Sequence, residues 1–249
     1  MGFEHYYYAL NRKAAKRIFD LTWNQFLEKF GWNKQRSQWE NIGGYLSFCL
    51  DKPSLPEEPT PEQIAPILRR TIRETLRHMS EEYFCILLLG EQLGKRSFIR
   101  TNVDAKKLEP DLDALNICAI SAFLNGDIDA RTLWCVLTVH RGWWSPDFFG
   151  LPKVERRRVN AAIRRFGPYR PRPLFDWQSP SAVRGGHKVL FEEDTRRFAR
   201  FIKLAWRENW SVYTRDSELI RFRTFELAAR LHAACPAFLG NCLVRYWGV

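Results

Sequence analysis

The sequence has 249 residues, of which 45% are hydrophobic, 14% are aromatic and 27% are charged, and its formal net charge at pH 7 is +11. This length supports one large domain or two small ones, and the aromatic content excludes a disordered chain. The longest apolar run, residues 83–89, is far shorter than the ~20 residues that a membrane-spanning helix needs. The N-terminus lacks the features of a secretory signal. We therefore expect a soluble cytoplasmic protein with no membrane partner.

In chain order, residues 1–105 predict a small α+β portion. The aromatic stretch at residues 5–10 is typical of a strand, and Asn11 can cap a helix over residues 11–30. We expect a second strand at residues 45–50, a proline-rich loop at 51–60 and a helix ending near Ser80. Residues 83–89 fit either a third strand or a buried helical end. Residues 90–109 are expected to be irregular.

Residues 106–249 predict a second, helical portion. Apolar residues recur at helical spacing, and glycine, asparagine or proline separates the segments. We expect Asp127 to cap the second of these helices. The expected helices cover residues 110–125, 127–141, 153–166, 195–210 and 217–234, with an arginine-rich loop at 168–186 and a short final helix ending at Tyr246. The predicted fold class is therefore mainly α, with a small N-terminal α+β portion and a helical C-terminal half.

The positive charge is concentrated in the second half of the chain. Residues 1–125 contain 17 Lys and Arg against 16 Asp and Glu, whereas residues 126–249 contain 22 against 12. All but three of these 22 cations are arginines. The planar arginine side chain suits bidentate phosphate contacts and stacking on bases, so this pattern favours a polyanionic partner. The alternative is that the arginines cover solvated helices or pair with carboxylates.

The clearest basic pattern lies in the helix expected at residues 195–210. At ~100° per residue, Phe198, Phe201, Ile202, Ala205 and Trp206 share one face. Four cations lie opposite that face, at Arg196, Arg200, Lys203 and Arg207. They span about 16 Å at ~1.5 Å per residue, which is long enough to meet several phosphates of one strand. An ion pair between Glu192 and Arg196 would weaken the N-terminal end of this pattern.

A second basic region combines the helix at residues 153–166 with the loop that follows. Aromatic residues are interleaved with arginines in this loop, and that combination is typical of single-strand recognition, although a loop packed on a core has the same composition. The predicted contact residues of this region are Arg157, Arg158, Arg164, Arg165, Arg170, Arg172 and Arg184.

The six cysteines show no C-x-x-C pair, so neither a zinc site nor a disulfide framework is expected. We interpret them as small buried hydrophobic residues. Phosphate-binding P-loops, dinucleotide fingerprints and zinc-protease motifs are also missing from the sequence. No metal or cofactor is therefore expected.

Catalytic patterns are few. Arg73 and His78 resemble the R-x4-H motif of HEPN-type ribonucleases, which implies metal-free RNA cleavage by an Arg/His pair across a helical dimer. The first 90 residues, in their order of strands and helices, are similar to the RRM-like half of CRISPR RNA-processing endonucleases of the RAMP class. The glycine-rich loop of that fold is missing, and Gly185-Gly186 is the only glycine pair nearby. In this interpretation His5 is a further catalytic candidate.

Three hypotheses follow from these patterns. The first is an intracellular nucleic-acid-binding protein, with RNA favoured over DNA, that acts as a subunit of a nucleoprotein complex. The second is a metal-independent ribonuclease that uses Arg73 and His78, or His5. The third is a protein-interaction scaffold whose arginines meet an acidic partner. More of the sequence supports binding than catalysis, so the protein is expected to be a binding protein rather than an enzyme.

Overall fold

The computed structural model describes residues 4–22, 80–92, 99–104, 111–140, 151–166, 187–207 and 217–248, together with single positions between 25 and 76. The chain forms two compact units, each built from separate stretches of sequence. Unit 1 contains Met1–Ala9, Arg100–Arg170 and Lys188–Val249, and unit 2 contains Leu10–Ile99 and Pro171–His187. Helices dominate the described residues, so the predicted mainly α class is confirmed. The expected division at residue 105 stays a prediction.

A four-stranded sheet joins the two ends of the described chain. Its strands, in sheet order, are β2 (Ile99–Asp104), β1 (Glu4–Leu10), β4 (Cys242–Gly248) and β3 (His187–Leu190). The prediction of β1 is confirmed. Two strands correct the sequence analysis, because β2 lies where irregular structure was expected and β4 replaces the expected final helix. β3 lies between the expected loop and the next expected helix, where no element was predicted.

The missed strands have physical explanations. β2 and β3 are at the edges of the sheet, where a strand needs few apolar residues. β4 is central and contains a buried run from Cys242 to Arg245, and a buried run this short has no periodicity that distinguishes strand from helix. Its partner β1 lies at the other end of the chain, so no pattern within β4 predicts that the two strands pair.

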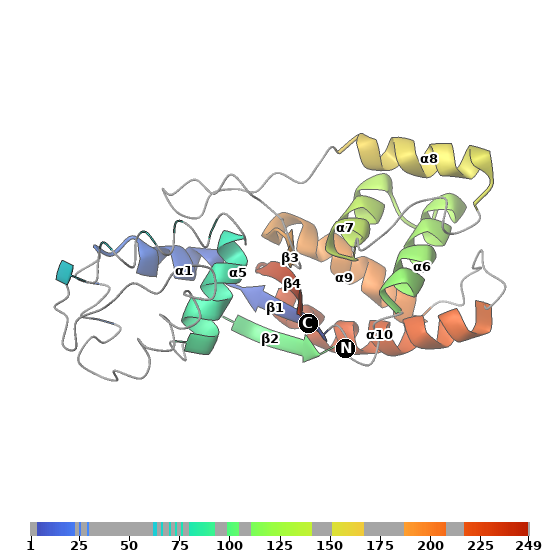
Figure 1. The fold of residues 1–249 in the computed structure, drawn as a ribbon. Coiled ribbons are helices and arrows are strands. Elements are labelled where there is room, and N and C mark those ends of the chain that lie inside the picture. Colours follow the sequence, from blue (N-terminus) through green and yellow to red (C-terminus); the bar gives the residue numbers. More distant parts are fainter. Residues whose placement is uncertain are drawn as a thin grey trace. The chain divides into compact units, whose positions relative to one another are not determined.

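The helices of unit 1 surround one hydrophobic core (Figure 1). They are α6 (Asp111–Asn125), α7 (Ala130–His140), α8 (Lys153–Arg164), α9 (Glu192–Arg207) and α10 (Ser217–Phe238). Gly126 ends α6 with a φ of 88°, a conformation that glycine adopts without strain. Asp129, rather than the predicted Asp127, caps α7 by accepting a hydrogen bond of 2.7 Å from the Thr132 amide.

Helix α9 is central to this unit. It packs against α7, α10 and β4, and its residues Phe198, Phe201 and Ile202 are fully buried in the core. β4 adds a buried arginine, Arg245, whose Nη1 donates a hydrogen bond of 2.7 Å to the carbonyl of Val139 near the end of α7. These contacts bury one face of α9 and leave Arg196, Arg200, Lys203 and Arg207 exposed.

Unit 2 contains helices α1 (Arg12–Phe19) and α5 (Glu81–Cys85) and the π-helix η1 (Ile86–Gln92). Asn11 caps α1 as predicted, by accepting a hydrogen bond from the Ala14 amide, but α1 ends at Phe19 rather than at residue 30. Residues 83–89 form the buried helical end, not the strand. Arg12 pairs with the buried Glu82 at 3.3 Å, which ties α1 to α5. The predicted strand at 45–50 and the loop at 51–60 lie outside the described residues.

Two further properties concern all of the described residues. In the described ranges, no helix is both long enough and apolar enough to cross a bilayer. The described cysteines are buried, as the sequence predicts, at Cys85, Cys118, Cys135, Cys235 and Cys242. Cys49 lies outside the described residues.

Candidate functional site

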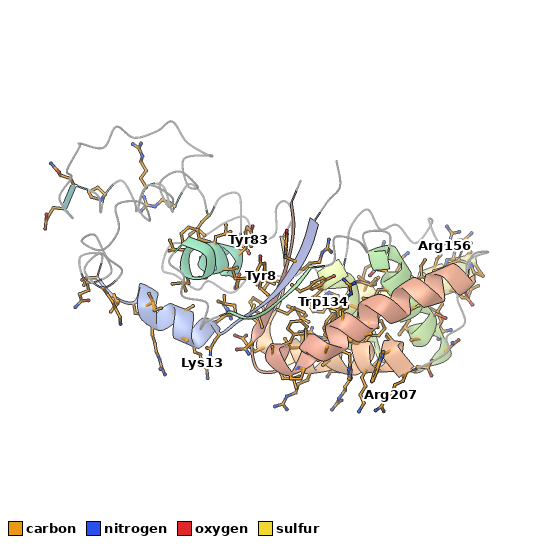
Figure 2. All side chains as sticks on the ribbon, turned by 90° about the horizontal axis from the view of Figure 1, so that it is seen from below. Tyr8, Lys13, Tyr83, Trp134, Arg156 and Arg207 are labelled. Carbon is orange, nitrogen blue, oxygen red and sulfur yellow. The ribbon has the colours of Figure 1, made fainter. Side chains whose placement is uncertain are left out.

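The outward face of α9 carries a row of four exposed cations, which we call the basic stripe: Arg196, Arg200, Lys203 and Arg207. The helix forms because its apolar residues recur every three or four positions and are buried in the core, while acidic residues in its first turn and Arg207 in its last turn complement the helix dipole. Figure 2 shows Arg207 projecting away from unit 1. The predicted orientation of these four side chains is confirmed.

The cations of the basic stripe form no described ion pair. Among the residues that the structure describes, no carboxylate forms an ion pair with any of the four cations, and the expected Glu192–Arg196 pair is not formed. Four neighbouring positive charges repel one another, and a bound anion would relieve that repulsion. The stripe therefore has the charge and the accessibility that phosphate binding requires.

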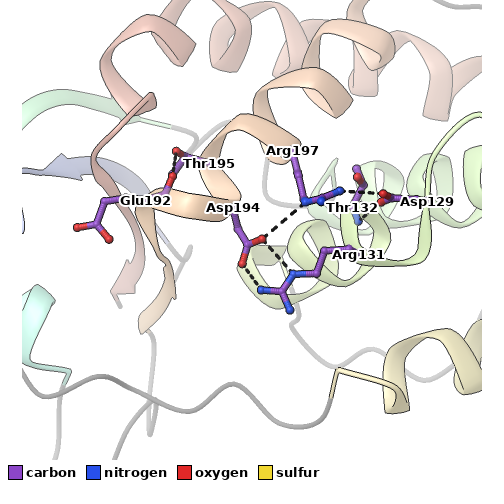
Figure 3. A network of polar contacts seen from close by, with 7 residues as sticks. All are labelled: Asp129, Arg131, Thr132, Glu192, Asp194, Thr195 and Arg197. Atoms are coloured by element: carbon purple, nitrogen blue, oxygen red, sulfur yellow. Dashed lines mark hydrogen bonds and ion pairs between the residues drawn. The ribbon is translucent and has the colours of Figure 1, made fainter.

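One flank of the stripe is fixed to α7 by a polar network (Figure 3). Arg197 lies next to Arg196 in sequence but turns toward α7, where its Nη1 donates a hydrogen bond of 2.8 Å to Asp129 Oδ2. Its Nε also lies 4.0 Å from Asp194 Oδ1 on the same helix. Arg197 is therefore occupied by carboxylates and does not extend the stripe.

Asp194 and Arg131 form the centre of this network. Arg131 binds the buried Asp194 with both Nε and Nη2, and the Nε–Oδ1 distance is 3.0 Å. The guanidinium carbon of Arg131 also lies 4.3 Å from the ring centroid of Trp134 and 5.2 Å from that of Phe166. The hydrogen bond to Asp194 raises the pKa of Arg131 above its usual value. These contacts join the first turns of α7 and α9 to the end of α8.

The charges of the network shift the pKa values of two titratable groups, Asp129 and Cys135. Partial burial opposes ionisation of Asp129, but hydrogen bonds from Thr132 and the charge of Arg197 lower its pKa below the usual value. Burial raises the pKa of the Cys135 thiol, and the nearby carboxylate of Asp194 raises it further. At neutral pH Asp129 is therefore charged and Cys135 is a neutral thiol.

The other flank of the stripe carries an aromatic stack where α9 meets α10. The rings of Trp206 and His232 lie 4.3 Å apart with an interplanar angle of 24°. Both residues are partly exposed, unlike the fully buried Phe198 and Phe201 of the same region. The stripe is therefore bordered by an ion-pair network on one flank and by aromatic rings on the other.

The second predicted basic region is only partly described. Val159 and Ala162 of α8 are buried, and four arginines of this helix and its end are exposed. We call them the α8 cluster: Arg157, Arg158, Arg164 and Arg165. As with the stripe, no described carboxylate pairs with them. Figure 2 shows Arg156 of α8 and Arg207 of α9 on different sides of unit 1.

Several predicted site residues cannot be joined to either surface. Arg170, Arg172 and Arg184 lie outside the described residues, as does His78. Arg73 is exposed, and His5 belongs to β1, where its side chain is not described. The proposed Arg/His ribonuclease pair therefore stays a prediction. In the described part of the chain, no three His, Cys, Asp or Glu side chains lie close enough together to hold a metal ion.

The sequence analysis missed the polar network and the aromatic stack. The spacing of Asp194 and Arg197 by three residues was available as a signal, since side chains at i and i+3 are neighbours on a helix. The pairing of Arg131 with Asp194 and the stacking of Trp206 on His232 join different helices, and one sequence contains no local trace of such contacts. Comparison of the sequence with models of protein families found no match, and comparisons with curated proteins and with solved structures found none either.

Proposed function

We propose that this protein binds nucleic acid through the basic stripe of α9, with RNA as the favoured partner, and that it acts as a subunit of a nucleoprotein complex. The observation that carries the proposal is the row of four exposed cations that form no described ion pair. Cations arranged in this way replace the counterions that are condensed on the phosphates of a nucleic acid, and the release of those counterions drives binding.

The rigidity of α9 supports the same conclusion. The helix is buried along Phe198, Phe201 and Ile202 and is fixed at its start by Asp194. Successive cations along the stripe are therefore held at spacings of about 4.5–6 Å along the helix axis. Binding therefore requires no folding of this helix, and only its long side chains become ordered in addition to the general cost of association.

The α8 cluster provides a matched comparison for the test. One variant changes Arg196, Arg200, Lys203 and Arg207 to Gln, and the other changes Arg157, Arg158, Arg164 and Arg165 to Gln. Both remove four positive charges from exposed helical positions. Affinity for labelled RNA, single-stranded DNA and duplex DNA is then measured by filter binding over a series of salt concentrations.

The stripe variant is expected to lose most of its affinity at moderate salt. For a single strand, the slope of log affinity against log salt should become shallower by about 3, because each phosphate contact contributes about 0.7. The α8 variant should keep the larger part of both affinity and slope. Equal losses in the two variants would contradict the assignment of binding to the stripe, because net charge or the α8 cluster, itself a predicted contact region, would then contribute as much. Unchanged binding in the stripe variant would refute the proposal.

An acidic protein partner is the competing explanation of the same charges. It is distinguished by competition, since polyglutamate carries negative charge without phosphate or base. Under the proposal, unlabelled RNA displaces the labelled RNA at much lower concentration than polyglutamate does. The purified protein is also expected to show a raised ratio of absorbance at 260 nm to that at 280 nm at low salt, because nucleic acid co-purifies with it.

A further inference from the structure

The aromatic stack of Trp206 and His232 lies directly beside the basic stripe. Trp206 follows Lys203 by three residues and precedes Arg207 by one, so it lies about 60° from Lys203 around the helix. His232 reaches the same place from α10. Positive charge and partly exposed aromatic rings are thus combined within one helical turn.

The rings of this stack are less buried than those at the centre of the core, although Trp206 packs against the edge of the core. Phe198 and Phe201, one or two turns earlier on α9, are completely buried, whereas Trp206 and His232 both remain partly exposed. Two rings that lie 4.3 Å apart at 24° present their planes in nearly the same direction. A third flat ring can continue such a stack, and nucleobases stack on aromatic side chains regardless of their sequence.

We propose that the α9 surface is specific for single-stranded nucleic acid, with phosphates along the basic stripe and a base continuing the stack formed by Trp206 and His232. This inference rests on the proposed function, which it makes more specific. The bases of a duplex are already paired and stacked and would have to leave the helix to reach these rings. The stripe alone would accept any polyanion, whereas the stack selects a strand whose bases are free.

The first test uses the unmodified protein and three ligands of equal length. These are an oligothymidylate strand, an abasic deoxyribose-phosphate strand with the same phosphates, and a DNA duplex. The base-bearing strand is expected to bind about 5- to 100-fold more tightly than the abasic strand, because base–aromatic stacking adds to the phosphate contacts. Equal affinities for these two strands would overturn the inference without need of any variant.

The second test changes the stack itself. His232→Leu keeps a similar side-chain volume but removes the ring, and His232→Phe keeps a ring. His232→Leu should lower affinity for the base-bearing strand to nearly that for the abasic strand, with an unchanged salt slope and unchanged duplex binding. His232→Phe should restore most of the loss. Oligouridylate should show the same pattern as oligothymidylate.

The outcomes separate this inference from the proposed function. If His232→Leu binds every ligand like the unmodified protein while the stripe variant loses binding, the stack is structural only and the inference fails alone. If the stripe variant also keeps its affinity, the proposed function has failed as well. A change of salt slope in His232→Leu would assign the loss to charge rather than to stacking, which also overturns the inference.

Discussion

Helix α9 carries its arginines in two regions that differ in their orientation and in their ion pairs. Arg197 faces α7 and is held by Asp129 and Asp194, whereas Arg196, its neighbour in sequence, faces outward in the basic stripe. The two positions are ~100° apart around the helix. The comparison teaches that a count of arginines overstates a binding surface, because some of them stabilise the fold. We expect the network side to affect stability and the stripe side to affect binding.

The largest effect on stability is expected at Asp194. Its replacement by Ala removes both hydrogen bonds to Arg131 and leaves a partly buried guanidinium without its carboxylate. The free energy of unfolding, measured by urea denaturation, should fall by about 2–3 kcal/mol. RNA affinity under conditions where the variant is folded should not fall. A large loss of affinity together with unchanged stability would contradict the division between the two regions.

Asp129 should show the next largest effect, and the effect should depend on pH. Asp129→Ala removes the cap of α7, which costs about 1 kcal/mol at pH 7. Because folding lowers this pKa, the carboxylate stabilises the protein above the unfolded-state value near 4. That stabilisation is lost as the pH falls through the lower folded-state value.

The measurement for Asp129 is the free energy of unfolding from pH 7 to pH 3. The difference between the unmodified protein and Asp129→Ala should shrink toward the acidic end. Asp127→Ala is the matched control, since this nearby exposed carboxylate does not accept the Thr132 amide, and it should change stability by less than about 0.5 kcal/mol. Equal effects at both positions would show that the cap is not the source.

Arg197→Gln tests the same network with a smaller expected change. Its ion pair with Asp129 is largely exposed, with 40% and 60% of the two side chains accessible. Such pairs contribute about 0.2–1 kcal/mol, so only a small loss of stability is expected. The salt dependence of RNA binding should remain that of the unmodified protein. A shallower salt slope would show that Arg197 contributes to binding, which would contradict the division between the network side and the stripe side of α9.

Arg196→Gln is the counterpart on the outward face, and it should leave stability within about 0.5 kcal/mol. Its effect belongs to binding: the slope of log affinity against log salt should become shallower by about 0.7 for a single strand. Arg196 and Arg197 differ by one position and lose the same charge, so this pair of variants is the most direct test of the division. Identical behaviour of the two variants would refute it.

The sequence predicted the parts of the molecule that depend on local periodicity. The burial of Phe198, Phe201 and Ile202 and the exposure of the four stripe cations follow from a 3.6-residue repeat, as do the helices themselves. The cap at Asn11 could be predicted because an N-cap side chain acts on an amide only three residues away, here that of Ala14. Local rules therefore determined the orientation of the candidate site.

Contacts between distant segments could not be predicted from the sequence. β4 is a strand because it lies between β1 and β3, and its own residues fit either structure. Arg131 of α7 donates hydrogen bonds to Asp194 of α9, and Trp206 of α9 stacks on His232 of α10. Each of these pairs is created by packing, so one sequence without related sequences contains no sign of them.

The position of β4 in the sheet has a consequence for how the protein folds. β4 separates β1 from β3, and it follows α10 in the chain. β3 therefore cannot join the sheet until β4 has been made, whereas β1 and β2 are neighbours in the sheet and both precede β4. Pairing across such a long stretch of chain slows folding. On the ribosome, β1 could pair with β2 and α6 could pack on α7 early, but the four-stranded sheet would be completed only after β4 has emerged.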